Sequence, residues 1–385
     1  MYFDYAATTP PNPEVLKTFE AVNRDFWANP QALHRPGARA AALLEQARLQ
    51  VLTLLGAKKE HRCVFTSGAT ESNNTALLGA ARANAARGKH VITSAVEHAS
   101  VREVFRFLES EGWELTTLPV NARGAVEPEV LTAALRPDTT LVSLMHVNNE
   151  IGSINDVDQL GRVIKTKSSA LFHVDAAQSV GKIPLALDGG PVDLLSFSAH
   201  KFFGLKGSGA LVLKNRINLP PLLRGGGQEE GLRSGTTDPA NAAALAKALR
   251  LAVEGHDEAF ARALTFKERI VAAFRDIPNT ELNGTLDGAS PFIINFSIAD
   301  IRPETVLQAL AEQEIYISTV SACSTQTATQ SAVVRALTGD LERARTSIRI
   351  SLSALTTADE VDALIQTIGP LIEASRFTRG KGVSS

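Results

Sequence analysis

The chain has 385 residues, of which 44% are hydrophobic and 21% charged, a composition typical of a globular protein with a large core. Lys and Arg number 39 against 41 Asp and Glu, so the net charge of −2 offers no basic surplus for a nucleic-acid backbone. Two cysteines are too few for a disulfide framework, and no apolar run is long enough for a membrane span. We therefore expect a cytoplasmic protein that binds neither nucleic acid nor membrane.

The N-terminal part is expected to form an extended arm over residues 1–12. The first helix signal comes at Asn12 and Pro13, where the asparagine can cap a helix and proline suits its first turn. A second helix is predicted over residues 41–55, because apolar side chains recur there at helical spacing and Gly56 follows as a stop.

Six short apolar runs then alternate with stretches long enough for helices. They cover residues 62–67, 90–95, 140–147, 170–176, 192–198 and 209–214. Each run has the length of a strand and is rich in β-branched or aromatic residues. The alternation predicts an α/β fold with a mainly parallel sheet.

The C-terminal part indicates a second, smaller unit. A helical region extends to about residue 275, and a smaller α+β pattern begins at the strand-like run 292–298. The last helix is expected from about Ala358, with Thr357 and Glu360 as a capping box. We predict a large domain over residues 13–255 and a small domain over 256–385, which the N-terminal arm joins.

Polar residues directly follow five of the predicted strands, where ligands of parallel sheets collect. The first such segment includes Ala69 and Thr70 after a glycine, and the open N–H groups of a helix start there suit a phosphate. An ordinary capped turn is the alternative interpretation of that segment.

Three further residues at strand ends each meet a different chemical requirement. Lys201 follows an apolar strand, where a partly desolvated amine can form an imine with an aldehyde. Asp175 ends another apolar strand and needs a cation beside it, and His98 offers a flat ring for stacking. A surface lysine, a capping aspartate and a core histidine are the alternatives. A phosphate site, an amine, a buried acid and a stacking ring together are the requirements of pyridoxal 5′-phosphate.

The sequence resembles the class V, fold-type I pyridoxal-phosphate enzymes, and among them the cysteine desulfurases of the nitrogen-fixation and iron–sulfur-assembly type. The matching segments occur in the family's order over almost the whole chain, at residues 4–10, 29–30, 65–74, 97–98, 145–152, 173–182, 192–207, 225–236, 321–323 and 347–352. The resemblance implies a large domain with a seven-stranded, mainly parallel sheet and a smaller C-terminal α+β domain.

The same resemblance implies how the cofactor is held. Lys201 would form the imine and act as the base, Asp175 would pair with the ring nitrogen, and His98 would stack over the ring. Gln178 would donate a hydrogen bond to the phenolic oxygen. The phosphate-binding residues would be Ala69, Thr70, Ser198 and His200, together with Thr236 from the partner subunit of a homodimer.

The resemblance also implies the substrate and the sulfur-carrying residue. Asn149 and Arg349 would bind the carboxylate of L-cysteine, for which a guanidinium is well suited. Cys323, in the segment Ser321-Ala322-Cys323, would be the nucleophile that accepts sulfur as a persulfide, with His98 assisting proton transfer. Val320 replaces a glycine of the family pattern, which stiffens the chain beside Cys323. Cys63 is interpreted as a structural residue.

We therefore predict a desulfurase that supplies sulfur to an acceptor or scaffold protein for iron–sulfur or other thio-cofactor synthesis, with no metal site. Two alternatives stay open at this point. A selenocysteine lyase or another class V aminotransferase would use the same cofactor residues, and a non-catalytic assembly partner would keep only the fold.

Overall fold

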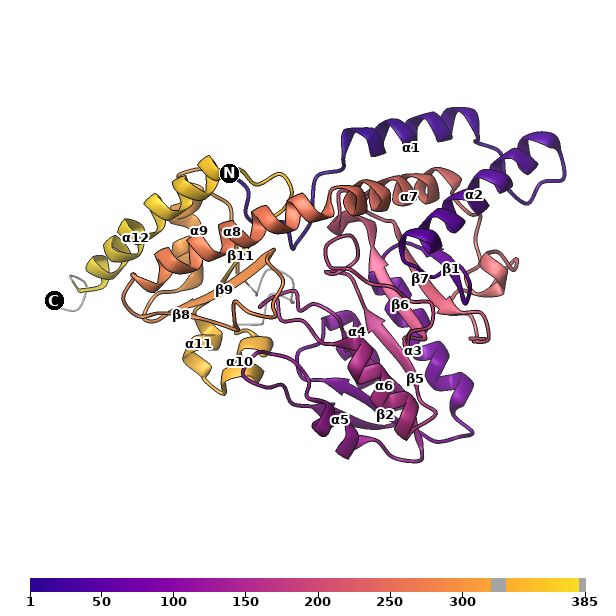
Figure 1. Ribbon diagram of the computed structural model, residues 1–385, viewed down its shortest axis with the longest axis horizontal. Coiled ribbons are helices and arrows are strands. Elements are labelled where there is room, and N and C mark those ends of the chain that lie inside the picture. The colour runs from indigo at the N-terminus through magenta and orange to yellow at the C-terminus, as the bar shows by residue number, and fades with distance from the viewer. Residues whose placement is uncertain (320–329, 381–385) are drawn as a thin grey trace.

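The computed structural model describes residues 1–319 and 330–380 and contains two sheets of different size (Figure 1). The larger sheet has seven strands in the order β1-β7-β6-β5-β4-β2-β3, and the smaller has four in the order β10-β11-β9-β8. None of the helices in these described ranges is both long and apolar enough to cross a bilayer.

The larger sheet confirms the predicted mainly parallel architecture. Its strands are β1 (His61–Thr66), β2 (His90–Ser94), β3 (Glu114–Leu118), β4 (Thr139–Met145), β5 (Leu171–Asp175), β6 (Leu194–Ser198) and β7 (Gly209–Lys214). Only β7 runs antiparallel to its neighbours. All six predicted runs form strands, whereas β3 escaped prediction because it lies at the sheet edge and its polar residues are mostly exposed.

Helices cover both faces of this sheet, as the alternation of strands and helices requires. They are α1 (Pro13–Asp25), α2 (Arg35–Leu54), α3 (Ala69–Asn84), α4 (Ala99–Ser110), α5 (Pro128–Ala134), α6 (Val157–Lys167) and α7 (Pro239–Glu254), with short 3₁₀ turns η1 (Ala199–Lys201) and η2 (Glu229–Gly231). One apolar core lies under α3 and α4, and another lies under α2, α5, α6 and α7.

Two helix boundaries differ from the sequence prediction. Helix α2 begins at Arg35 and not at residue 41, because the His34 ring accepts a hydrogen bond from the Gly37 N–H and caps a start that the apolar spacing does not mark. The helical region before residue 275 consists of two helices that meet at Gly255. The Asn12 cap of α1 is confirmed.

The smaller unit has a core of its own. It contains β8 (Thr280–Leu282), β9 (Ile293–Ile298), β10 (Ser318–Thr319), β11 (Ser347–Ser351), α8 (His256–Arg275), α9 (Pro303–Ala311), α10 (Ala332–Thr338), α11 (Leu341–Arg345) and α12 (Ala358–Gly380). The rings of Phe274 and Phe296 stack at its centre. The capping box of Thr357 and Glu360 starts α12 as predicted. We propose Gly255 as the domain boundary, since it separates α7 of one unit from α8 of the other.

The N-terminal arm contacts both units. Phe3 is fully buried in the smaller core, and its backbone bonds to Tyr316 and Ser351. A few residues later, Thr9 donates its N–H to the His200 carbonyl at 2.9 Å, beyond the end of β6. The arm therefore ties the edge of the small sheet to the strand ends of the large one.

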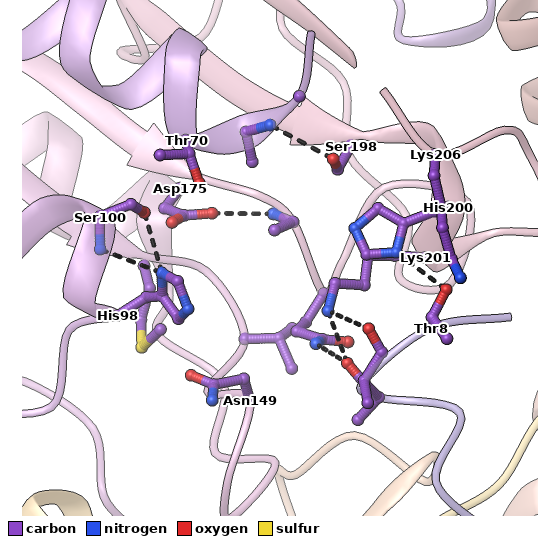
Figure 2. Close-up of a pocket in the computed structure, with 18 of the residues that line it drawn as sticks. Thr8, Thr70, His98, Ser100, Asn149, Asp175, Ser198, His200, Lys201 and Lys206 are labelled. Atoms are coloured by element: carbon purple, nitrogen blue, oxygen red, sulfur yellow. Dashed lines mark hydrogen bonds between the residues drawn. The ribbon is translucent and has the colours of Figure 1, made fainter. Parts of the chain in front are cut away.

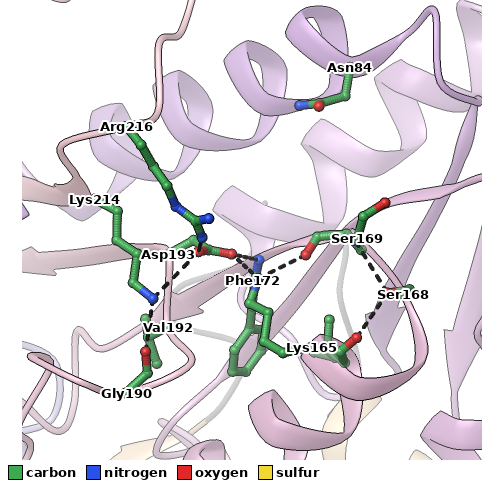
Figure 3. Close-up of polar contacts among 12 residues, drawn as sticks. Asn84, Lys165, Ser168, Ser169, Phe172, Gly190, Val192, Asp193, Lys214 and Arg216 are labelled. Atoms are coloured by element: carbon green, nitrogen blue, oxygen red, sulfur yellow. Dashed lines mark hydrogen bonds and ion pairs between the residues drawn. The ribbon is translucent and has the colours of Figure 1, made fainter. Parts of the chain in front are cut away.

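Asp193 is a buried anion immediately before β6, at the end of the strand opposite to the one followed by Lys201 (Figure 3). Its carboxylate accepts the Phe172 N–H at 2.9 Å and pairs with Lys165 and, at 2.9 Å, with Arg216. The Lys214 ammonium lies 3.8 Å away. One carboxylate thus attracts three cations at the point where β5 and β6 begin and β7 ends.

We expect Asp193→Asn to lower the free energy of unfolding by about 2–4 kcal/mol, because the buried carboxylate can no longer balance the cations around it. Urea unfolding measures this change. Glu111→Gln is the matched control, since Glu111 forms an exposed pair with Arg82 and its loss should cost less than about 0.5 kcal/mol. Equal effects of the two substitutions would contradict the structural role of Asp193.

Candidate active site

A cavity of about 500 Å³ lies at the carboxyl ends of β2, β4, β5 and β6, closed on one side by the N-terminal arm (Figure 2). It brings together ten of the twelve site residues predicted from the sequence: Ala69, Thr70, His98, Asn149, Asp175, Gln178, Ser198, His200, Lys201 and Arg349. The cavity lining also includes Ala6, Ala7, Thr8, Ser100, Met145 and Lys206, which sequence reasoning missed.

One end of the cavity is formed by the start of α3. Gly68 is the N-cap residue of this helix, with φ +149°, and it has no side chain to cap the first N–H groups as an Asn or Ser at this position would. A Cβ on Gly68 would lie 3.0 Å from the Ser198 hydroxyl, and the Ala69 N–H donates to that hydroxyl at 3.3 Å. The open helix start and the hydroxyl form a cradle that fits a phosphate group.

Charged side chains border this cradle. Burial alone would raise the pKa of Glu71, but hydrogen bonds from Arg233 and Ser67 lower it overall. Glu71 is therefore an anion that Arg233 neutralises. Burial, together with the nearby ammonium groups of Lys201 and Lys206, lowers the pKa of His200 to about 4, so the His200 ring is neutral.

Asp175 ends β5 as a buried carboxylate that is 4% exposed. The Asn73 amide donates to one of its oxygens at 2.8 Å and the Ala177 N–H to the other at 3.0 Å. Within residues 1–319 and 330–380, no cationic side chain lies within ion-pair distance of it. A buried carboxylate of this kind is stabilised by a cation, and a protonated pyridine nitrogen in the cavity would supply one.

His98 is the N-cap of α4 and lines the cavity on the side of Asp175 (Figure 2). Its Nδ1 atom accepts the Ser100 N–H at 3.1 Å, so the neutral ring carries its proton on Nε2. Burial lowers the pKa of His98, which favours this neutral form. The neighbouring Glu97 joins β2 to β4 through the Met145 N–H, and burial raises its pKa to about 8.

Lys201 extends from η1 toward the N-terminal arm. Its Nζ atom donates to the carbonyl oxygens of Ala6 at 2.7 Å and Ala7 at 2.9 Å. Thr8 continues the contact, since its hydroxyl lies 3.1 Å from Nδ1 of His200. The arm therefore forms part of the cavity wall. Residues 4–10 match the family pattern, but these small residues have no helix or strand periodicity that would indicate this role.

Arg349 on β11 forms the end of the cavity that belongs to the smaller unit. Its Nη1 donates to the Asn149 carbonyl at 2.8 Å, and its Nη2 pairs with the Asp4 carboxylate at 2.8 Å. Its Nε is buried and has no hydrogen-bond partner among the described residues. The side chain is thus held at both terminal nitrogens, each of which carries a second N–H.

The remaining predicted residues lie elsewhere. Thr236 borders a smaller cleft that shares Ser67 and Gly207 with the cavity, so within one chain it does not line the predicted site. Cys323 and Val320 lie outside the described residues. Cys63 is buried in β1, and burial raises the pKa of its thiol to about 12, which agrees with a structural role.

Comparison with known proteins identifies the family. The model of the class V aminotransferases matches residues 1–364, so the chain belongs to this family, within which its relatives are NifS and IscS proteins. A NifS/IcsS protein homolog of Lactobacillus delbrueckii subsp. bulgaricus is 43% identical over 95% of both chains. The cysteine desulfurase IscS of Dictyoglomus turgidum is 40% identical over 98% of this chain and 95% of its own length.

Solved structures show the same architecture. A NifS-like protein superposes with a TM-score of 0.90 at 35% identity, covering 98% of this chain and 99% of its own. A structure described as SspA in complex with cysteine superposes with a TM-score of 0.80 at 36% identity, covering 92% and 99%. The cofactor of this family is pyridoxal 5′-phosphate, and the helix-start cradle, the unpaired carboxylate and the amine of Lys201 fit its phosphate, ring nitrogen and aldehyde.

Lys201 and Lys206 line the cavity, and Lys182 donates to Gln178 in its wall. We expect Lys201 to hold the cofactor covalently, because it follows the end of β6 and extends between the cradle and the arm. Borohydride reduction of the yellow protein, followed by peptide mapping, should place the adduct on Lys201. Lys182 and Lys206 serve as internal controls in the same digest. An adduct on either of them, or none at all, would refute the assignment.

Proposed function

We propose that the protein is a pyridoxal-phosphate-dependent cysteine desulfurase, which removes sulfur from L-cysteine, releases L-alanine and receives the sulfur on Cys323 as a persulfide. The observation that carries this proposal is the convergence of an amine, a buried acid and a guanidinium from three separate segments on one cavity. The names of the relatives support the substrate.

The cofactor would be held along the strand ends. Ala69, Thr70, Ser198 and His200 would hold the phosphate, since they lie at the helix-start cradle. When bound, the cofactor withdraws electrons from the substrate Cα and so weakens its C–H bond. Asp175 would stabilise the positive charge of the ring nitrogen, and its fixed bonds to Asn73 and Ala177 keep the carboxylate in place.

Arg349 and Asn149 would bind the substrate at the other end of the cavity. The Asp4 carboxylate and the Asn149 carbonyl orient the guanidinium plane before a ligand arrives, which reduces the entropy lost on binding. A substrate carboxylate would then accept from the donors that these contacts leave.

Proton transfer would involve two groups that line the cavity. Lys201 would carry a proton on Nζ away from the substrate Cα once its amine is released, and the Ala6 and Ala7 carbonyls provide acceptors that hold the resulting ammonium. His98 would stack over the ring and offer the proton on Nε2 to the cavity, because Ser100 occupies Nδ1.

The described residues that flank Cys323 in sequence support its role. Ser318 pairs with Arg349 in the register of β10 and β11. On the other side, the Ser331 hydroxyl donates to the Glu150 carboxylate at 2.5 Å, next to Asn149. Ser318 and Ser331, which precede and follow this segment in sequence, thus both lie beside the substrate-binding residues.

The finer parts of the proposal concern partners and location. A homodimer would bring Thr236 of one chain to the phosphate of the other, and the cleft that Thr236 borders adjoins the cavity at Ser67 and Gly207. The persulfide would pass to an acceptor or scaffold protein for iron–sulfur or other thio-cofactor synthesis in the cytoplasm. Alanine and sulfide formation from L-cysteine separates this function from that of an aminotransferase, and a comparison with L-selenocysteine separates it from a selenocysteine lyase.

We expect Cys323→Ser to abolish sulfur transfer, with sulfide release falling on the order of 100-fold or more, because a hydroxyl is protonated near neutral pH and cannot store sulfur. Binding of L-cysteine should still change the visible absorption, since Lys201, Asp175 and Arg349 are untouched. Mass spectrometry of the wild type after incubation with L-cysteine should find added sulfur on the Cys323 peptide.

Cys63→Ser is the matched control for this experiment. The thiol of Cys63, with its pKa raised to about 12, is not ionised at pH 8, so alkylation at that pH should modify Cys323 and spare Cys63. Cys63→Ser should keep sulfide release within about twofold of the wild type while lowering stability by burying a hydroxyl. Added sulfur on Cys63 alone would exclude the proposed role of Cys323.

We expect a homodimer whose two sites depend on each other. Light scattering should give twice the chain mass, and Thr236→Ala should weaken phosphate binding, seen as a higher dissociation constant for the cofactor. Thr237→Ala is the control for loss of a neighbouring hydroxyl. A monomer that binds the cofactor and turns over cysteine would disprove the shared site.

A further inference from the structure

Gln178 is held at both ends of its side-chain amide. Nε2 donates to the Ala6 carbonyl at 2.9 Å, and Oε1 accepts from the Lys182 ammonium at 3.3 Å. The residue is 4% exposed and lines the cavity. An amide has one acceptor end and one donor end, so a donor at Oε1 and an acceptor at Nε2 together determine which way the group is turned.

Lys182 is itself fixed in the turn that follows β5. Its N–H donates to the Ser179 carbonyl at 2.9 Å, and its own carbonyl accepts from Nε2 of His256 at 3.0 Å. The preceding Gly181 has φ +75°, and a Cβ there would lie 2.9 Å from the Ala252 side chain. Close packing of this glycine therefore fixes the backbone that carries Lys182, which does not line the cavity itself.

We propose that Lys182 is a positioning residue, which keeps the Gln178 amide turned so that its nitrogen donates to the phenolic oxygen of the cofactor. The proposal rests on the roles proposed above for Lys201 and Gln178. With one N–H committed to Ala6, Nε2 has a second for the cofactor. A reversed amide would present Oε1 to an anionic oxygen, where two acceptors repel each other.

The charged groups around Lys182 are consistent with this role. Burial, together with the nearby cations of Lys201 and Arg349, lowers the pKa of Lys182 to about 7. His200 is also near and neutral, and Asp4 is paired with Arg349. Both the ammonium and the amine of Lys182 carry N–H groups, so the contact to Oε1 persists on either side of this pKa.

The proposal predicts a spectroscopic effect. The phenolic oxygen and the nitrogen bonded to Lys201 attract the same proton, so a donor on the oxygen makes that proton easier to lose. Lys182→Met removes the donor that orients Gln178 and should raise the pH midpoint of the visible absorption change by about half a unit to one unit. Lys182→Arg keeps the donor and should restore most of the wild-type midpoint.

Lys267→Met is the matched control, because Lys267 is another buried lysine, 1% exposed, whose ammonium donates to the Ser290 carbonyl, and neither residue lines the cavity. It should change the melting temperature and leave the midpoint unmoved. Gln178→Glu provides a second variant of similar size, which cannot donate and should raise the midpoint in the same direction.

A double-mutant cycle separates the effect of the Gln178 amide orientation from the effect of the Lys182 charge on the midpoint. In a Gln178→Ala background, Lys182→Met should cause no further shift, because its effect passes through the amide. A full additional shift there, or an unmoved midpoint in Lys182→Met or Gln178→Glu, would overturn the proposal. A wild-type protein without any visible band would instead refute the proposed roles of Lys201 and Gln178, so the two failures are distinguishable.

Discussion

The contact between the N-terminal arm and two cationic side chains is the interaction on which the site depends. Arg349 comes from the small sheet and Lys201 from the large one, and the arm binds the first through the Asp4 carboxylate and the second through the Ala6 and Ala7 carbonyls. Because Asp4, Ala6 and Ala7 lie within four residues of one another, these bonds limit the distance between the two cations. These residues form a turn in which the Ala7 N–H donates to the Asp4 carbonyl at 3.0 Å, and this turn sets the spacing between amine and guanidinium.

The strand ends provide the rest of the geometry. Met145 and Asp175 pair in register on β4 and β5, and Asp175 pairs with Ser196 on β6, so its backbone is fixed on both sides. The carboxylate itself is held by Asn73 and the Ala177 N–H. Such a group loses little entropy when a ligand binds, because its orientation is already determined. Asp193 and its cations lie at the other end of β6, where their ion pairs contribute to the stability of the fold and do not line the cavity.

The sequence was sufficient to predict the site residues that end or closely follow an apolar strand. The length of the strand, its alternation with helices and the polar residues after it are all local signals. Lys201, Asp175 and His98 were found in this way. It was insufficient for the arm, since Ala6 and Ala7 act through backbone carbonyls that any residue would offer. The edge strand β3 was missed because its exposed positions carry no apolar pattern. The partnership of Asp4 with Arg349 joins residues 345 positions apart, and no periodicity indicates such a contact.

Charge balance explains why the cavity is suited to an anionic cofactor and an anionic substrate together. Lys201, Lys206 and Arg349 line it, and Lys182 donates to Gln178. Among the described residues, the Asp4 carboxylate already pairs with Arg349, and the Glu71 carboxylate with Arg233. Burial and the surrounding cations keep His200 uncharged, so the ring adds no further positive charge. A phosphate and a substrate carboxylate are attracted by the cations that line the cavity, and this attraction contributes to their affinity.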